Sequence, residues 1–240
     1  MTTLALCLKG SDGIALVSDS RGTFGDPRGI TAQNDNMKKV YDVSRYVGVL
    51  FAGSGEIGAM VFQEITQSLS NSPIEGVTPI LELIRELLIT KYDEWFPGFL
   101  IRPIQGSETP VRPGLAVIIG GYEVIAGEIP TQQKIYSLNS LNNFAPMLHD
   151  YGFALQGIAQ YALYLLNRLY VQEMPVDTLL RLGAYVITET ASQDGKVGGP
   201  VQALKIMPQE GCYLLSEDDI NTINETNNTR RNDLRSLFGG

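Results

Sequence analysis

Residues 3–21 read TLALCLKGSDGIALVSDSR, and this stretch decides the fold. Two β-prone runs, residues 3–9 and 14–19, flank the turn-forming sequence Gly-Ser-Asp-Gly, so they predict an antiparallel hairpin. The second run ends on a carboxylate, Asp19. Because a hairpin returns the end of its second strand to the start of its first, we expect Asp19 to lie near the N-terminal residues.

The first residues carry a candidate nucleophile. Met1 is followed by a small residue, Thr2, and such sequences favour removal of the Met. Removal would leave Thr2 with a hydroxyl and an α-amine, whose reference pKa of about 7.7–8.0 lets it accept a proton at neutral pH. A neighbouring N-terminal amine is one way to activate a Thr hydroxyl. Since many proteins begin Met-Thr, this feature acquires meaning only from the rest of the chain.

Composition excludes several classes of protein. The chain has 240 residues, of which 44% are hydrophobic and 18% charged, so a large core is expected. A net charge of −8 argues against nucleic-acid binding, which usually shows a basic face. Two separated cysteines and a single histidine, His149, indicate neither a disulfide framework nor a zinc site, and His149 is expected to be structural or on the surface. With no apolar run of about 20 residues and no signal peptide, we expect a cytoplasmic protein and no membrane partner.

Further along the chain, strands and helices come in alternating groups. Polar or Pro- and Gly-rich sequence over 20–36 and 97–113 predicts loops. Helical spacing of apolar residues predicts helices over 57–69, 79–95, 157–171 and 175–192. β-prone runs predict further strands over 38–43, 46–52, 114–121, 122–126, 134–138, 151–155, 201–206 and 212–215. The last residues, 216–240, are polar and Asn-rich, which is typical of a mobile tail.

This order of elements predicts an α+β fold. The sequence passes from strands to two helices, back to strands, to two more helices and to closing strands, with no boundary that splits the core. Two stacked antiparallel sheets, each covered by a helix pair, would bury the apolar strands on both sides. We therefore predict a four-layer αββα sandwich in one domain, residues 1–215, followed by the tail 216–240.

The motifs and their order resemble proteasome β-type subunits. The resemblance rests on residues 3–21, on NMKKVYDV at 36–43 and on YVGVLFAGSGE at 46–56, and the segment 194–199 fits the late D-x-x-x-G-G stretch. The sequence SDSR at 18–21 is particularly similar to bacterial ancestral β-type homologues. The resemblance implies the N-terminal-nucleophile (Ntn) hydrolase fold, a ring-forming homo-oligomer, a peptide or unfolded-protein substrate and no cofactor.

The resemblance also assigns roles to single residues. It implies that Thr2 is the nucleophile, that Asp19 is the acid at the end of the second strand, and that Lys39 is the ammonium beside the Thr. Gly53 would supply the oxyanion-hole N–H, and Asp194 matches the acid of the late loop. A Lys held positive by Asp19 would lower the proton affinity of the nearby amine and hydroxyl.

The chain departs from the family pattern at two positions and in its register. Val197 and Ile158 occupy places that the family often fills with Ser, whose hydroxyls help to hold the amine of the nucleophile. The family's spacing from nucleophile to acid fits Thr3 and Asp19 without a gap, whereas Thr2 fits only with one extra residue in the first turn. With Thr3 in the nucleophile's place, Thr2 would block its amine.

Three functions remain open at this point. The first is a proteasome-type threonine peptidase whose Thr2 is exposed by Met1 removal. The second is a catalytically inactive structural subunit of the same ring, favoured by the two missing Ser and by the Thr3 register. The third is an amidase or transpeptidase of narrow specificity that uses the same nucleophile.

Overall fold

The computed structural model describes residues 3–25, 31–70 and 74–239. The strands are β1 (Leu4–Lys9), β2 (Ile14–Ser18), β3 (Gly22–Gly25), β4 (Thr31–Asn34), β5 (Val40–Ser44), β6 (Val47–Gly53), β7 (Leu115–Tyr122), β8 (Gln133–Asn139), β9 (Met147–Leu148), β10 (Phe153–Gly157), β11 (Gln202–Met207) and β12 (Gly211–Leu214). The α-helices are α1 (Gly55–Ser70), α2 (Val77–Trp95), α3 (Ala159–Leu169), α4 (Val176–Gln193) and α5 (Glu217–Ser236), and one 3₁₀ turn spans Ser140–Asn142.

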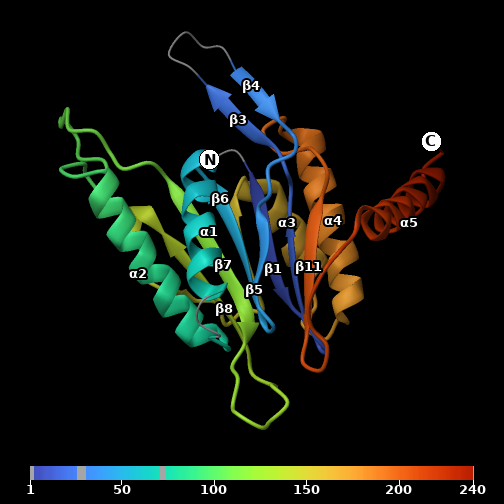
Figure 1. The fold of residues 1–240 in the computed structure, drawn as a ribbon. Coiled ribbons are helices and arrows are strands. Elements are labelled where there is room, and N and C mark those ends of the chain that lie inside the picture. The colour runs from blue at the N-terminus through green and yellow to red at the C-terminus, as the bar shows by residue number, and fades with distance from the viewer. Residues whose placement is uncertain (1–2, 26–30, 71–73, 240) are drawn as a thin grey trace.

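Two antiparallel five-stranded sheets form the centre of the molecule. One has the order β10-β1-β2-β11-β12, and the other has the order β5-β6-β7-β8-β9. Figure 1 shows α1 and α2 on the outer side of the second sheet, and α3 and α4 on the outer side of the first. The predicted four-layer α+β sandwich is therefore confirmed.

The buried residues explain why the layers hold together. Three apolar clusters fill the spaces between α1–α2 and their sheet, between α3–α4 and theirs, and between the two sheets. Strands β1, β2 and β7 are buried along their whole length, since each has a sheet or a helix pair on either side. The continuous apolar runs in the sequence follow from this double coverage.

The structure differs from the predicted elements in three main segments, and it also forms β9 and the 3₁₀ turn where no element is predicted. The predicted loop at 20–36 contains strands β3 and β4, which pair with each other and extend from the body of the molecule in Figure 1. The strand predicted over 122–126 does not form, because β7 ends at Tyr122 and the chain loops out before β8. The sequence analysis expects no regular element in the tail 216–240, whereas the structure forms α5 there.

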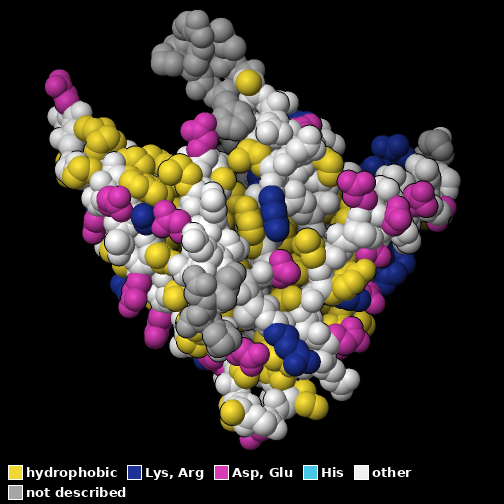
Figure 2. Space-filling view, viewed as in Figure 1, with side chains coloured by type: hydrophobic (Ala, Val, Ile, Leu, Met, Phe, Trp, Pro, Cys, Tyr) yellow, Lys and Arg dark blue, Asp and Glu magenta, His cyan; other side chains and the backbone are white. Residues whose placement is uncertain are grey.

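Helix α5 begins on a capping box and ends in exposed residues. The Ser216 side chain accepts from the Asp219 backbone N–H, and the Asp219 side chain accepts from the Ser216 backbone N–H. Among its residues only Ile220 is buried. Figure 1 shows the helix projecting from the body, and Figure 2 shows basic and acidic side chains along it. The tail is polar as predicted, but local capping and charge favour a helix.

Close contact between the two sheets depends on Gly120 of β7. A Cβ at Gly120 would collide with the Cys7 sulfur of β1, which is fully buried in the layer between the sheets. We expect Gly120→Val to reduce the free energy of unfolding by about 1–3 kcal/mol, because overpacking forces the sheets apart. Gly195→Ala is the matched control: its Cβ would meet nothing within 4 Å, so a change below about 0.5 kcal/mol is expected in urea unfolding. Equal stability of the two variants would contradict this account.

Candidate active site

A hydroxyl, a carboxylate and an ammonium meet at one end of the sheet sandwich. The Thr3 hydroxyl donates to Asp19 Oδ1 at 2.8 Å, and the Lys39 ammonium donates to the same oxygen at 2.9 Å. Lys39 Nζ also donates to Thr3 Oγ1 and, at 2.6 Å, to the Arg21 carbonyl. All three side chains are buried, with Asp19 at 0%, Thr3 at 1% and Lys39 at 3% exposure. Thr3, Asp19 and Lys39 therefore form one connected hydrogen-bond network.

The fold brings these residues together from both sheets. Strands β1 and β2 pair so that Ala5 faces Ser18, which places Thr3 and Asp19 at the same end of the hairpin. Lys39 comes directly before β5, at the start of the first strand of the opposite sheet. Its backbone N–H donates to Gln202 Oε1 at 2.9 Å, so β11 of the first sheet holds the start of β5 in place. The β1–β2 hairpin and the hydrogen bond between Lys39 and Gln202 together position the Lys39 side chain next to Thr3.

The Asp19 carboxylate accepts hydrogen bonds from several donors. Besides Thr3 and Lys39, it accepts from the backbone N–H groups of Leu4 at 3.1 Å, Arg21 at 3.3 Å and Gly198 at 3.0 Å. A buried carboxylate is tolerated when it is paired and hydrogen-bonded in this way. The pKa of Lys39 is lowered overall, because the effect of burial outweighs the opposing effect of the Asp19 carboxylate. The paired ammonium is therefore easier to deprotonate than an ordinary surface lysine.

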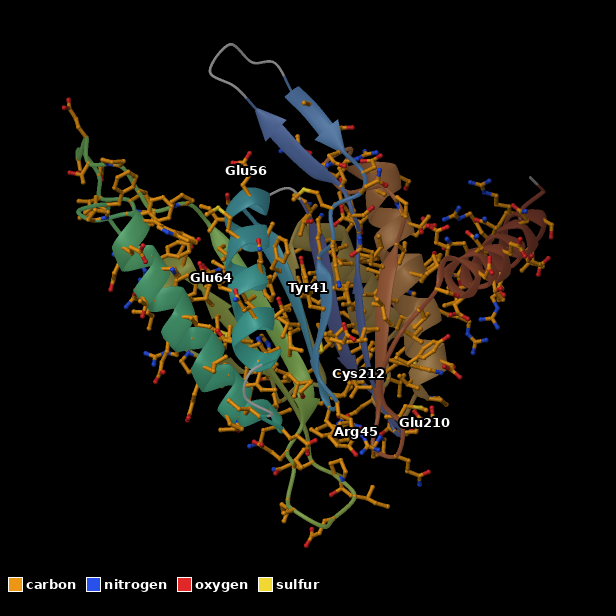
Figure 3. All side chains as sticks on the ribbon, viewed as in Figure 1. Tyr41, Arg45, Glu56, Glu64, Glu210 and Cys212 are labelled. Atoms are coloured by element: carbon orange, nitrogen blue, oxygen red, sulfur yellow. The ribbon has the colours of Figure 1, made fainter. Side chains whose placement is uncertain are left out.

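A cavity opens beside Thr3. It has a volume of about 320 Å³, and its walls include Thr3, Arg21, Thr23, Lys39, Phe51 and the segment 52–56. Gly53 lies in this wall at the end of β6, with a φ of +122° that favours glycine. Figure 3 shows Glu56 at the outer end of α1, near the β3–β4 hairpin. A small molecule or a peptide side chain could thus reach the Thr3 hydroxyl from this side.

The cavity wall is stiffened from behind by aromatic rings. Phe51 stacks on Phe62 of α1 with centroids 5.2 Å apart, and Tyr41 stacks on Phe62 at 4.8 Å. Figure 3 shows Tyr41 on β5, on the side covered by α1. Such ring contacts limit the side-chain motion of Phe51. This part of the cavity wall is therefore already formed by contacts within the protein.

The structure does not bring Asp194 to the hydroxyl. Its carboxylate accepts from the Lys196 backbone N–H at 2.9 Å, within the turn that follows α4. The loop reaches the site instead through Gly198, whose N–H binds Asp19, and through the Gly195 carbonyl, which accepts from Arg21 Nη1 at 2.9 Å. Backbone groups of the late loop, not its acid, make the described contacts with the network.

The two positions without a Ser lie beside the network. The Ile158 N–H donates to the Thr3 carbonyl at 2.8 Å, which places residue 158 next to Thr3. Val197 is buried at 1% exposure, and both side chains belong to the apolar cluster under α3 and α4. At these two places the surroundings of Thr3 are apolar, so neither side chain can bind an amine.

Thr2, the nucleophile expected from the sequence, lies outside the described residues. Thr3 instead contributes the hydroxyl that contacts Asp19 and Lys39. The gap-free spacing between Thr3 and Asp19 was the sequence signal for this register. Lys39 and Gly53 line the cavity, and Asp19 contacts Thr3 and Lys39 without being part of the cavity wall.

Sequence reasoning missed the ion pair that supports the site. Arg21 donates to both carboxylate oxygens of Asp35, at 2.7 and 2.8 Å, and so ties the start of β3 to the end of β4. Ser20 Oγ donates to the Asp35 carbonyl at 2.5 Å. The SDSR sequence at 18–21 contains both side chains, but their partner lies 14 or 15 residues away, after β3 and β4, whose pairing only the fold reveals.

The part of the chain that the structure describes contains no cluster of metal ligands. Across residues 3–25, 31–70 and 74–239, no group of three or more His, Cys, Asp or Glu side chains is arranged to hold an ion. Over the same residues, no helix is long and apolar enough to cross a membrane.

Comparison with known proteins shows what the chain is similar to. Residues 2–81 match the family model described as proteasome subunit. The proteasome subunit beta of Saccharomonospora viridis is 25% identical over 224 residues, covering 89% of this chain and 72% of the relative. That of Saccharopolyspora erythraea is 26% identical over 210 residues, covering 86% and 67%. This chain is similar to proteasome β-type subunits. The resemblance drawn from the sequence is therefore confirmed.

Solved structures agree on the fold. Anbu (ancestral beta-subunit) from Yersinia bercovieri superposes with a TM-score of 0.71 at 16% identity, covering 98% of this chain and 96% of that one. Anbu from Hyphomicrobium sp. strain MC1 superposes with a TM-score of 0.69 at 18% identity, covering 98% and 97%. The chain thus has the Ntn-hydrolase fold of proteasome β-type proteins, as predicted.

Proposed function

We propose that this proteasome-like protein is a threonine peptidase whose nucleophile is the Thr3 hydroxyl. The observation that carries the proposal is the contact of that hydroxyl with both Asp19 and Lys39 in a buried site beside an open cavity. The Lys39 ammonium favours the alkoxide form of Thr3, and Asp19 keeps the ammonium charged despite its burial. A nucleophile held between an acid and a base has the arrangement that covalent catalysis requires.

The reaction follows from these groups once Thr3 has a free α-amine. In the sequence Thr2 precedes it through a peptide bond, so residues 1 and 2 must be removed first. The Thr3 hydroxyl then attacks the substrate carbonyl, and its own amine accepts the hydroxyl proton and passes it to the leaving amine. The Gly53 N–H stabilises the oxyanion, an effect worth about 2.7–4 kcal/mol of barrier in enzymes that use such donors. Water then hydrolyses the ester to Thr3.

The same resemblance leads us to propose a ring of identical subunits in the cytoplasm that acts on peptides or unfolded proteins. Asp194 would act in this scheme by shaping the loop that carries Gly198, since its carboxylate binds within its own turn. No metal or organic cofactor takes part in the proposed reaction.

A second candidate is a catalytically inactive subunit of the same fold. Val197 and Ile158 favour it, because they place apolar side chains where a hydroxyl could have held the amine of Thr3. It also follows directly if Thr2 stays attached and blocks that amine. An amidase or transpeptidase of narrow specificity would use the same atoms as the peptidase and differ only in substrate.

Intact-mass measurement of the purified protein tests the proposal. The mass is determined before and after reaction with a probe that needs both the hydroxyl and the amine of an N-terminal Thr. A chain that begins at Thr3 and gains one adduct is the expected result. A chain that keeps Met1 or Thr2 and gains no adduct would favour the inactive subunit. An adduct on a chain that begins at Thr2 would move the nucleophile to that residue. A panel of peptide and small amide substrates then separates peptidase from amidase.

A further inference from the structure

The single histidine of the chain takes no part in the Thr3 network. His149 follows the edge strand β9, and its Nε2 lies 2.8 Å from the Ser137 hydroxyl of the neighbouring strand β8. The His149 backbone N–H donates to the Ile135 carbonyl at 2.9 Å, which fixes the residue against β8. A serine hydroxyl and an imidazole within hydrogen-bond distance form the minimal pair for nucleophilic catalysis.

Ser137 faces a cavity of its own. Ile135 belongs to the cluster between the sheets, and Ser137, two residues further along the strand, points to the same side. There it lines a cavity of about 530 Å³ whose walls also include Arg102, Asn139, Asn142 and Gln156. Gln156 comes from β10, the edge strand of the opposite sheet, so the cavity lies at the open edge of the sandwich. None of its lining residues borders the cavity beside Thr3.

The polar groups of this cavity are only partly used by the fold. Asn142 Oδ1 is buried and has no hydrogen-bond partner among the described residues, although such atoms are normally paired. Asn139 uses Oδ1 to accept from the Leu141 N–H at 2.9 Å, which leaves its amide hydrogens available. Arg102 donates through Nε to the Leu141 carbonyl at 2.5 Å, and its two terminal nitrogens make no hydrogen bond to the residues that the structure describes. The cavity thus offers a cation and amide donors to a ligand.

The imidazole is in the form that a base requires. Burial lowers the pKa of His149, the nearby Lys9 lowers it further, and Asp150 raises it. The ring is therefore largely neutral at pH 7, and with its hydrogen on Nδ1 it can accept the Ser137 proton at Nε2.

We infer that Ser137 and His149 form a second, independent acyl-transfer site for small esters whose acyl group carries a carboxylate. Ser137 Oγ attacks the ester carbonyl, and His149 Nε2 takes the hydroxyl proton and delivers it to the departing alcohol. The Ser137 ester is then cleaved by water, whose proton passes through His149, so that the free acid leaves and the serine is restored. Arg102 binds the substrate carboxylate, and the amides of Asn139 and Gln156 face the developing oxyanion. This inference does not depend on Thr3.

Labelling with an alkyl fluorophosphonate, followed by peptide mapping, tests the site in the full-length protein. We expect a single adduct on Ser137 that survives Thr3→Ala, disappears in Ser137→Ala and forms at least 100-fold more slowly in His149→Gln. An adduct that forms equally fast in His149→Gln would overturn the dyad, as would the absence of an adduct on Ser137 in the unsubstituted protein. The second result needs no variant, so it stands even where a substitution impairs folding.

Rates of ester hydrolysis test whether the site prefers substrates that carry a carboxylate, which labelling of Ser137 alone does not show. Mono-p-nitrophenyl succinate should be turned over at least tenfold faster than p-nitrophenyl acetate, and Arg102→Gln should remove that preference. A preference that persists in Arg102→Gln would overturn the assignment of the carboxylate to this arginine. The readout is distinct from peptide cleavage, so failure here leaves the proposal for Thr3 intact, and the reverse also holds.

Discussion

Replacement of Thr3 by Ala is expected to lower peptide hydrolysis by about a thousandfold or more, whereas Thr2→Ala should leave it within a few-fold of the unsubstituted protein. Removal of a covalent nucleophile has effects of this size in hydrolases. Thr3 supplies the hydroxyl that contacts Asp19 and Lys39. In the proposed mechanism Thr2 is cleaved off beforehand, so its side chain takes no part in the reaction. The measurement is kcat/KM on a peptide substrate, with the N-terminal mass of each variant determined in parallel.

The pair of variants separates the two registers that the sequence leaves open. If Thr2→Ala abolishes hydrolysis while Thr3→Ala retains it, the nucleophile is Thr2 and the proposed assignment is wrong. Thr3→Ser is the conservative control, because it keeps the hydroxyl between Asp19 and Lys39 and should retain measurable activity. A circular-dichroism melt shows whether any loss reflects unfolding.

Replacement of Asp19 by Ala is expected to reduce the free energy of unfolding by about 3–5 kcal/mol. The carboxylate is fully buried, and its removal leaves the Lys39 ammonium buried without its counter-ion. It also leaves three backbone N–H groups without this acceptor, those of Leu4, Arg21 and Gly198. Urea unfolding followed by circular dichroism measures the effect without any assumption about catalysis.

Asp35→Ala is the matched control for this prediction. Asp35 also pairs with a cation, Arg21, but its side chain is 42% exposed, and exposed ion pairs contribute about 0–1 kcal/mol. The loss of unfolding free energy for Asp19→Asn should lie between those of Asp19→Ala and Asp35→Ala, since Asn keeps an acceptor oxygen but loses the charge. A cost below 1 kcal/mol for Asp19→Ala would mean that the network is not a structural element of the fold.

The architecture could be predicted from the sequence because most strands and helices of the core have a local pattern of apolar residues that identifies them. The β-prone runs at the start of the chain and the helical spacing in 79–95 each predict their element without reference to distant residues. The missed elements have two different causes. Helix α5 follows from a local capping box that the polar composition of the tail obscured, whereas the pairing of β3 with β4 involves residues far apart in the chain. The Arg21–Asp35 ion pair joins the start of β3 to the end of β4, and the sequence of these strands has the polar composition of a loop.

The candidate site divides in the same way. Residues 3–21 determined that a Thr and Asp19 would share one end of a hairpin, and the order of motifs added Lys39 and Gly53. Only the tertiary structure decided that Thr3 supplies the contacting hydroxyl, that Gly198 and not the Asp194 carboxylate reaches Asp19, and that Ser137 meets His149 across two strands. The physical reason is that spacing along a strand follows from the sequence. The direction of a loop and the pairing of distant strands follow instead from how the two sheets pack.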